Sequence, residues 1–224
     1  MSPHESEALC SVLGQSPRTR TESQGASDAH ACSVPVALAE SRHAVSRSRS
    51  GRDSRAVVAV LHGWKLCPRC ASLVEPVDGR AECSACGYIV YANPVPAACA
   101  LCTDDAGRIL LTRRAWEPYA GMWDLPGGFL HEDEHPLDGL RRELAEETGL
   151  DVEPTEWFGA FMKLYGHGPG ARCVLNLVWR TRVTGGEERA ADDVSEIRWF
   201  SRAELPPLEE IAMAEPVGVW LDES

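Results

Sequence analysis

One segment of this chain constrains its fold more than any other, the run RELAEETGL at residues 142–150. Upstream of it, Pro136 suits the first position of a helix, and Gly149 suits the left-handed residue that ends one. The apolar residues between these two signals recur at the spacing of one helical face, at Leu137, Leu140 and Leu144. Such a stripe seats a helix on a core. The sequence therefore predicts an amphipathic helix that begins near residue 136 and ends near residue 148.

Three carboxylates share one face of this predicted helix. Glu143, Glu146 and Glu147 stand at positions i, i+3 and i+4, so their side chains are neighbours. Each like-charge pair costs a few tenths of a kcal/mol, roughly, and an i to i+4 contact between Arg142 and Glu146 offsets only part of it. A divalent cation such as Mg²⁺ or Mn²⁺ turns this repulsion into coordination. We expect the carboxylates to point into a cleft and to bind metal.

The residues before the helix complete a longer pattern. Gly128 is followed by five residues and Glu134, then by seven residues and the run from Arg142 to Leu150, which makes nine specified positions in 23 residues. This pattern closely resembles the Nudix box, and the preceding residues fit the usual entry to it: Trp123, Leu125, Pro126 and Gly127. The resemblance implies the α/β/α sandwich of that family, with a mixed sheet. The predicted Nudix domain covers residues 92–224.

The resemblance also implies a division of work within the box. Glu146 and Glu147 would be the first metal ligands, and Glu143 would be a third ligand or the group that deprotonates water. Arg142 would orient these glutamates, while Glu134 would brace the loop or join the metal cluster. The turn at Gly127 and Gly128 lets the backbone offer a carbonyl oxygen to the metal.

Residues outside the box are candidates for the rest of the site. Several acids in a later loop compete to complete the metal shell, and Asp193 is favoured among Glu187, Glu188, Asp192, Asp193 and Glu196. Arg113 and Arg114 end a predicted strand and would clamp a diphosphate. Five aromatic residues offer walls for a base: Trp116, Tyr119, Trp123, Trp157 and Phe158. Trp123 is placed with the arginines and the two glycines among the substrate-binding candidates.

Four of the nine cysteines form two Cys-x-x-Cys pairs, Cys67 with Cys70 and Cys83 with Cys86. This spacing is typical of zinc, and four thiolates leave no open position, so the metal would be structural. A small zinc ribbon is therefore predicted at residues 63–91. The remaining five cysteines are scattered, and no disulfide is expected among them.

Composition limits the range of partners. The net charge of −12 argues against broad affinity for nucleic acid or for an anionic membrane. Residues 1–62 are rich in Ser, Arg and Ala without a sustained hydrophobic period, which predicts a disordered tail. Neither a transmembrane run nor a signal peptide is recognisable, so a cytoplasmic location is expected.

Strand signals surround the predicted helix. Turn residues between them predict strands at 95–102 and 109–113. Alternation predicts two more at 156–164 and 172–183, separated by a glycine-rich loop at 166–170, and another strand is predicted at 196–200. Ser201 and Glu204 form a capping box, which predicts a helix starting there and further helix toward Trp220.

Nudix relatives that carry a zinc ribbon act on ADP-ribose, FAD or NADH. The NADH pyrophosphatases have a Ser-Gln-Pro-Trp stretch after the box, where this chain reads TEWFGAF at residues 155–161, and the run at 91–96 is more similar to the ADP-ribose and FAD group. We expect a metal-dependent hydrolase that cleaves a nucleoside diphosphate linked to another moiety and releases a nucleoside monophosphate. Two alternatives are a hydrolase of nicotinamide-capped RNA and a non-catalytic ligand sensor. The resemblance also allows a homodimer.

Overall fold

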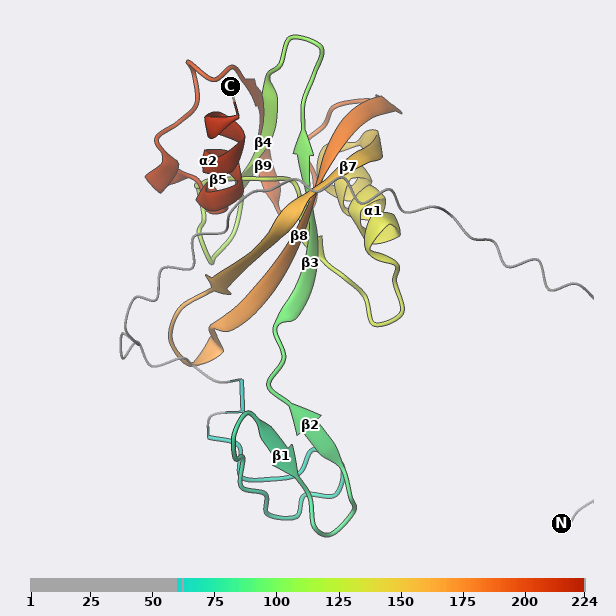
Figure 1. Ribbon diagram of the computed structural model, residues 1–224, viewed down its shortest axis with the longest axis vertical. Coiled ribbons are helices and arrows are strands. Elements are labelled where there is room, and N and C mark those ends of the chain that lie inside the picture. The colour runs from blue at the N-terminus through green and yellow to red at the C-terminus, as the bar shows by residue number, and fades with distance from the viewer. Residues whose placement is uncertain (1–59, 62, 224) are drawn as a thin grey trace, which may run out of the picture. The chain divides into compact units, whose positions relative to one another are not determined.

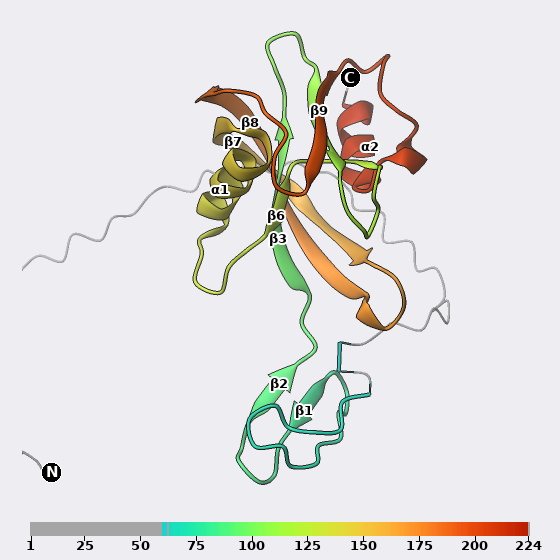
Figure 2. The same cartoon turned by 180° about the vertical axis from the view of Figure 1, so that it is seen from behind.

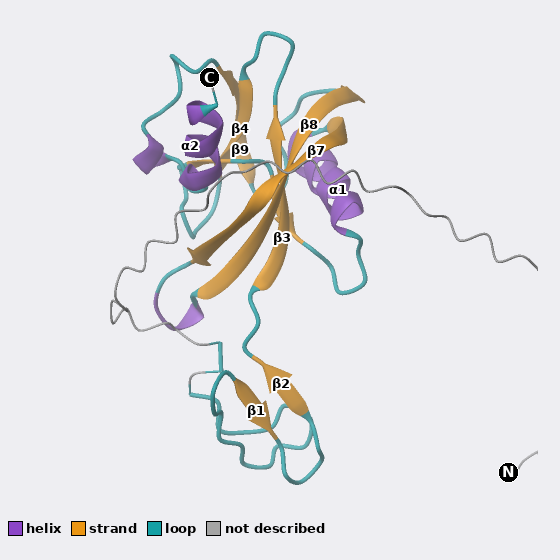
Figure 3. Ribbon diagram, viewed as in Figure 1, coloured by secondary structure: helices purple, strands orange, loops and turns teal. Residues whose placement is uncertain are grey.

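The computed structural model describes residues 60–61 and 63–223, and the tail predicted at 1–62 lies almost wholly outside the described residues. The elements follow one another as β1 (Arg80–Glu82), β2 (Ile89–Tyr91), β3 (Val95–Cys102), β4 (Ile109–Arg114), β5 (Trp123–Asp124), β6 (Gly127–Phe129), α1 (Pro136–Thr148), β7 (Leu150–Tyr165), β8 (Arg172–Gly186), β9 (Val194–Phe200) and α2 (Ala214–Asp222), with short 3₁₀ turns at Gly168–Gly170 and Leu208–Glu210 (Figures 1 and 3). Within this part of the chain, no helix has both the length and the apolar character needed to cross a membrane.

Two sheets form the centre of the fold. One has the order β6-β3-β8-β7, in which β3 runs parallel to β8 and the other pairs are antiparallel. The second has the order β5-β4-β9 and is antiparallel throughout. The parallel pair beside antiparallel neighbours confirms the predicted mixed sheet.

Successive side chains of the central strands β3 and β4 point to opposite sides of the sheet and pack into two separate cores. Residues of β3 and β4 that face one side pack with α2, in a cluster that includes Cys99, Leu101, Ile109, Leu111, Val217 and Trp220. Residues that face the other side pack with α1, in a cluster that includes Ala98, Ala100, Cys102, Leu110, Leu140 and Leu144. The two helices accordingly lie on opposite sides of the sheets (Figures 1 and 2). The α/β/α sandwich is confirmed, and no disulfide joins the cysteines of the described residues.

Helix α1 begins and ends where its sequence signals predicted. The Nδ1 of His135 accepts a hydrogen bond from the backbone N–H of Leu137 at 3.3 Å, directly before the first turn. Gly149 has φ 71° and donates its N–H to the carbonyl oxygen of Ala145, which closes the helix. Of the predicted apolar stripe, Leu140 and Leu144 are fully buried, whereas Leu137 is only half-buried. The helix is thus fixed at both ends and anchored on the core through Leu140 and Leu144.

The predicted strands are present, but several boundaries differ. β3 has the predicted bounds, while β7 and β8 are longer than predicted and pair over almost their whole length through three register shifts. The short strands β5 and β6 had no counterpart in the prediction, because two or three residues are too few for a visible alternation.

The helix predicted at Ser201 is wrong. The capping-box contact does form, since the hydroxyl of Ser201 donates to the Glu204 carboxylate at 2.7 Å. However, residues 202–204 make only a turn. Pro206 and Pro207 follow at once, and a residue before proline is kept out of the helical conformation. The helix expected toward Trp220 is present as α2.

Candidate functional site

A cavity of about 340 Å³ lies where α1 faces the strands and the loop before β9. Its lining residues come from six strands, from α1 and from the connecting loops: Ala97, Cys99, Arg114, Tyr119, Asp124, Leu125, Gly127, Gly128, Phe129, Leu130, His131, Glu143, Glu147, Lys163, Tyr165, Val174, Asn176, Asp192, Asp193 and Met213. Four carboxylates gather on the side formed by α1 and the loop before β9, namely Glu143, Glu147, Asp192 and Asp193. This side is the acidic wall of the cavity.

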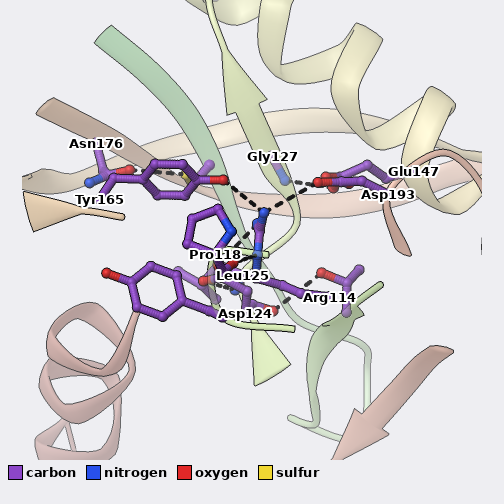
Figure 4. A network of polar contacts seen from close by, with 12 residues as sticks. Arg114, Pro118, Asp124, Leu125, Gly127, Glu147, Tyr165, Asn176 and Asp193 are labelled. Carbon is purple, nitrogen blue, oxygen red and sulfur yellow. Dashed lines mark hydrogen bonds and ion pairs between the residues drawn. The ribbon is translucent and has the colours of Figure 1, made fainter. Parts of the chain in front are cut away.

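Glu147 is the most deeply placed of these acids. Its residue is 5% exposed, and its Oε2 accepts a hydrogen bond from the backbone N–H of Gly127 at 2.8 Å (Figure 4). Burial raises the pKa of Glu147 well above its usual value, and the neighbouring charges of Asp193 and Glu143 raise it further, while the Gly127 N–H acts in the opposite direction. An ionised carboxylate at this position needs a compensating cation.

Glu143 lies against the glycine turn. Gly128 has no side chain, and a Cβ at that position would meet the Glu143 carboxyl group at about 2.5 Å. Burial raises the pKa of Glu143, partly offset by its contact with Arg142. The glycine therefore makes the room in which this carboxylate faces the cavity.

Arg142 organises the outer side of the box. Its guanidinium holds Glu134 through two hydrogen bonds of 2.7 and 2.8 Å and also donates to Glu143 at 2.8 Å and to Glu146 at 3.0 Å. A fifth contact reaches the carbonyl oxygen of Phe129 at 3.2 Å. The bond to Arg142 lowers the pKa of Glu134 to about 2. Arg142 thus has the contacts of the orienting residue predicted from the sequence.

The other box glutamates lie outside the cavity lining. Glu134 accepts the backbone N–H of His131 at 3.1 Å in addition to Arg142, so it braces the loop before α1. The Glu146 side chain is 51% exposed and contacts Arg142. Its predicted role as a first metal ligand stays a prediction, and in the structure Glu143 and Glu147 are the box acids that face the cavity.

Among the five downstream acids, only Asp192 and Asp193 line the cavity. Glu188 instead accepts the indole N–H of Trp199 at 2.8 Å, and Glu196 pairs with Arg113 at 3.3 Å. Asp193 also accounts for part of the raised pKa of Glu147. This geometry supports the preference for Asp193.

The side chains of the two candidate arginines point in different directions. Successive residues of a strand point to opposite faces, so Arg114 enters the cavity while Arg113 turns away and contacts the carbonyl oxygen of Gly121. The guanidinium of Arg114 is held by Tyr165 Oη at 2.8 Å, the carbonyl oxygen of Pro118 at 3.0 Å and Asp193 at 3.4 Å (Figure 4). The Oδ2 of Asp124 lies 3.7 Å from Nη1 of Arg114.

The aromatic candidates also differ in whether they line the cavity. Trp123 is 8% exposed and packs edge-on against Phe200 in the core, so it does not line the cavity as a substrate-binding wall would. Its neighbour Asp124, on the opposite face of β5, does line it. Of the five aromatic residues proposed as walls, Tyr119 is the one in the lining.

Sequence reasoning missed five polar residues of the cavity: Asp124, His131, Lys163, Tyr165 and Asn176. Asn176 carried a visible signal, because an amide in the apolar run of β8 is out of place in a buried strand. Lys163 and Tyr165 are two residues apart in β7 and so share a face. Asp124 is buried enough that its pKa rises to about 6.

The predicted zinc cysteines come together in space. The sulfur atoms of Cys67, Cys70, Cys83 and Cys86 all lie within 4.8 Å of one another. Each pair closes a similar turn, in which the residue four positions after the first cysteine donates its N–H to that cysteine's carbonyl oxygen, Ala71 at 2.9 Å and Gly87 at 2.8 Å. Four sulfur donors in this arrangement match a tetrahedral metal site.

Comparison with known proteins agrees with this geometry. The NUDIX domain model matches residues 93–219. Among curated proteins, the chain is 37% identical over 101 residues to a MutT-like protein of Streptomyces ambofaciens, covering 45% of this chain and 60% of that protein. It is 33% identical over 121 residues to an ADP-ribose pyrophosphatase of Methanocaldococcus jannaschii, covering 54% of this chain and 70% of that protein. It is 24% identical over 156 residues to an NAD-capped RNA hydrolase of Caenorhabditis elegans, covering 69% of this chain and 41% of that protein.

The similarity extends to solved structures. A NUDIX hydrolase from Nitrosomonas europaea superposes with a TM-score of 0.58 and 26% identity, covering 71% of this chain and 92% of that one. The curated relatives are matched over only part of their length, 41% to 70% for the three named above. The domain match nevertheless spans more than half of this chain and contains both the box and the cavity. The chain therefore belongs to the Nudix hydrolase family.

Proposed function

We propose that this protein is a metal-dependent hydrolase that cleaves the diphosphate of a nucleoside diphosphate linked to another moiety, releasing a nucleoside monophosphate. The observation that carries the proposal is the convergence of Glu143, Glu147 and Asp193 on one wall of the cavity. Burial and mutual repulsion raise the pKa values of both glutamates, and Arg142 contacts only Glu143 of the three. Hard divalent cations such as Mg²⁺ or Mn²⁺ prefer such oxygen ligands.

Each residue of the acidic wall and its neighbours has a proposed role in metal binding or proton transfer. A bound divalent cation would polarise the phosphoryl oxygens and lower the pKa of an attacking water. Glu147 and Asp193 would hold it, and Glu143 would be a third ligand or would accept a proton from the water. Arg142 keeps Glu143 in place through their 2.8 Å contact. The N–H of Gly127 fixes the Glu147 carboxylate, so the site is organised before the substrate arrives.

The substrate class rests on the relatives and on the cavity. A protein named ADP-ribose pyrophosphatase is 33% identical to this chain, which supports an ADP-ribose-type substrate. The cavity offers aromatic side chains, Tyr119, Phe129 and Tyr165, against which a flat ring can pack. FAD and NADH are the other members of the proposed class.

A substrate panel tests this function. Purified protein with Mg²⁺ or Mn²⁺ is incubated with ADP-ribose, FAD, NADH, diadenosine polyphosphates and nucleoside triphosphates, and the products are identified by mass spectrometry. We expect AMP from at least one of the first three, and no product after EDTA treatment. Binding of ADP-ribose without AMP release would instead identify a ligand sensor.

Hydrolysis of nicotinamide-capped RNA is the second candidate. An NAD-capped RNA hydrolase matches 69% of this chain, a larger share than the other two relatives match. The net charge of −12 is unfavourable for holding a long RNA. Rates on NAD and on NAD-capped RNA at equal concentration decide between a hydrolase of small dinucleotides and a hydrolase of capped RNA, because a cap hydrolase prefers the RNA.

Light scattering on the same preparation tests the predicted homodimer.

We propose that the four cysteines hold a structural zinc ion. In small modules such binding contributes about 10 to 16 kcal/mol and amounts to the folding free energy. Cys83→Ser should therefore abolish stoichiometric zinc, measured by elemental analysis, and should expose β1 and β2 to hydrogen exchange. The matched control is Cys173→Ser, which changes a free thiol on β8 and should keep one zinc per chain. Full zinc retention in Cys83→Ser would contradict the assignment.

A further inference from the structure

The chain uses arginine almost exclusively as its basic residue. Of 22 lysines and arginines, the lysines are only Lys65 and Lys163. Lys65 is exposed, but Lys163 is a half-buried residue of β7 that lines the cavity. Its Nζ lies 4.6 Å from the centroid of the Tyr119 ring. A side chain that is costly to bury thus stands in the cavity of the proposed hydrolase site.

Lys163 lacks a hydrogen-bonding partner in the part of the chain that the structure describes. No side chain or carbonyl oxygen there accepts a hydrogen bond from its Nζ, and no carboxylate lies within 4.0 Å. Burial lowers the pKa of Lys163, the opposing charge of Asp124 raises it in part, and the like charge of Arg114 lowers it further. Three ammonium donors are therefore available to a ligand.

Arg114, in contrast to Lys163, has several hydrogen-bonding partners. Its Nε donates to Pro118, one terminal nitrogen donates to Tyr165 and Asp193, and the other lies 3.7 Å from Asp124. These contacts fix the position of the side chain, which is only 15% exposed. Arg113 points away from the cavity and pairs with Glu196. The diphosphate clamp expected at these two arginines stays a prediction, but Arg114 is already held by neighbouring residues and Arg113 faces away from the cavity.

We propose that Lys163 is the residue of the cavity that contacts the diphosphate of the substrate, donating hydrogen bonds to a non-bridging oxygen. The proposal rests on the proposed function. The acidic wall requires metal before it can accept a polyanion, whereas Lys163 attracts one directly. Arg114 acts as a positioning residue that holds Asp193 and Tyr165 in place.

The contact also has a consequence for the reaction. Water adds its oxygen to one phosphorus and loses a proton, the bond from that phosphorus to the bridging oxygen breaks, and the bridging oxygen leaves on the second phosphate. Negative charge grows on this leaving phosphate. An ammonium bound to it stabilises the transition state more than the ground state, so Lys163 should affect kcat as well as KM.

Lys163→Met tests the contact, because methionine keeps the length of the side chain and removes its charge. We expect kcat/KM to fall about 10- to 100-fold, the size of one charge-assisted hydrogen bond, and to fall by a similar factor for every substrate that is cleaved. Lys163→Arg should recover part of the loss. The matched control is Arg182→Met, which removes an exposed cation from β8 and should leave kcat/KM unchanged.

Two kinetic outcomes would overturn the proposal. One is an unchanged kcat/KM in Lys163→Met. The other is a loss confined to substrates that share one base or sugar, since Lys163 would then read that moiety rather than the diphosphate.

A labelling experiment on the wild-type protein does not depend on turnover or on the folding of a variant. The lysines are acetylated with a water-soluble ester in the presence of Mg²⁺, with and without α,β-methylene-ADP, and modified peptides are quantified by mass spectrometry. The analogue should protect Lys163 several-fold and leave Lys65 unprotected. Equal labelling of Lys163 in both samples would refute the contact. Protection without any hydrolysis on the substrate panel would refute the proposed function and leave the Lys163 contact standing.

Discussion

Glu147→Gln should lower kcat by about three orders of magnitude while the protein remains folded. The carboxylate is buried among Glu143 and Asp193, and an amide weakens metal binding at the deepest point of the acidic wall. Loss of about 4 kcal/mol of metal-dependent stabilisation corresponds to such a factor. The amide oxygen of glutamine can still accept the N–H of Gly127, so the turn before α1 keeps its contact.

The stability of the variant separates this explanation from simple damage. Without metal, the neutral side chain removes a buried charge and its repulsion with two neighbours, so the unfolding temperature should stay the same or rise. With saturating Mn²⁺, the wild type should gain more stability than the variant, because only its intact acidic wall binds the ion tightly. Asp138→Asn serves as the control, since this acid of α1 is 72% exposed and contacts Arg141 on the helix surface. Full activity in Glu147→Gln would remove Glu147 from the proposed metal site.

The helix and its carboxylates were predictable because their signals are local. A proline and a glycine mark the bounds of α1, and two of its three leucines form the buried face, all within 14 residues. The cysteine pairs are local in the same sense, and their sulfur atoms do converge. The continuous apolar runs of β3 and β4 are also local signals, and they are consistent with core on both sides of the sheet.

The cavity beyond the box was less predictable, because strand register determines it. One step along β4 exchanges Arg113 for Arg114, and one step along β5 exchanges Trp123 for Asp124. Sequence alone did not show which member of each pair faces the cavity. Lys163 was missed for a related reason: β7 contains three register shifts, so its alternation is interrupted before the cavity.

Gly127→Ala should destabilise the protein more than Gly107→Ala, a glycine substitution that also places a side chain at positive φ. Gly127 has φ 137°, and an added Cβ would collide with the carbonyl oxygen of Ala98 and lie 2.6 Å from the Cα of Cys99. Both atoms belong to the backbone of β3, which pairs with β6 at this point and cannot rotate away as a flexible side chain can. We expect a cost of about 2 to 4 kcal/mol, which combines backbone strain and displaced strand pairing.

The comparison with Gly107→Ala isolates the collision from the strain. Gly107 also has positive φ, 71°, but a Cβ there meets nothing within 4 Å, so its substitution should cost only about 1 kcal/mol. Chemical denaturation of both variants gives the difference directly. Displacement of β6 also moves the Gly127 N–H away from Glu147, so Gly127→Ala should lose metal-dependent activity even at temperatures where it remains folded. Equal stability of the two variants would show that β6 can separate from β3 without cost, and the rigid turn would then not be what positions Glu147.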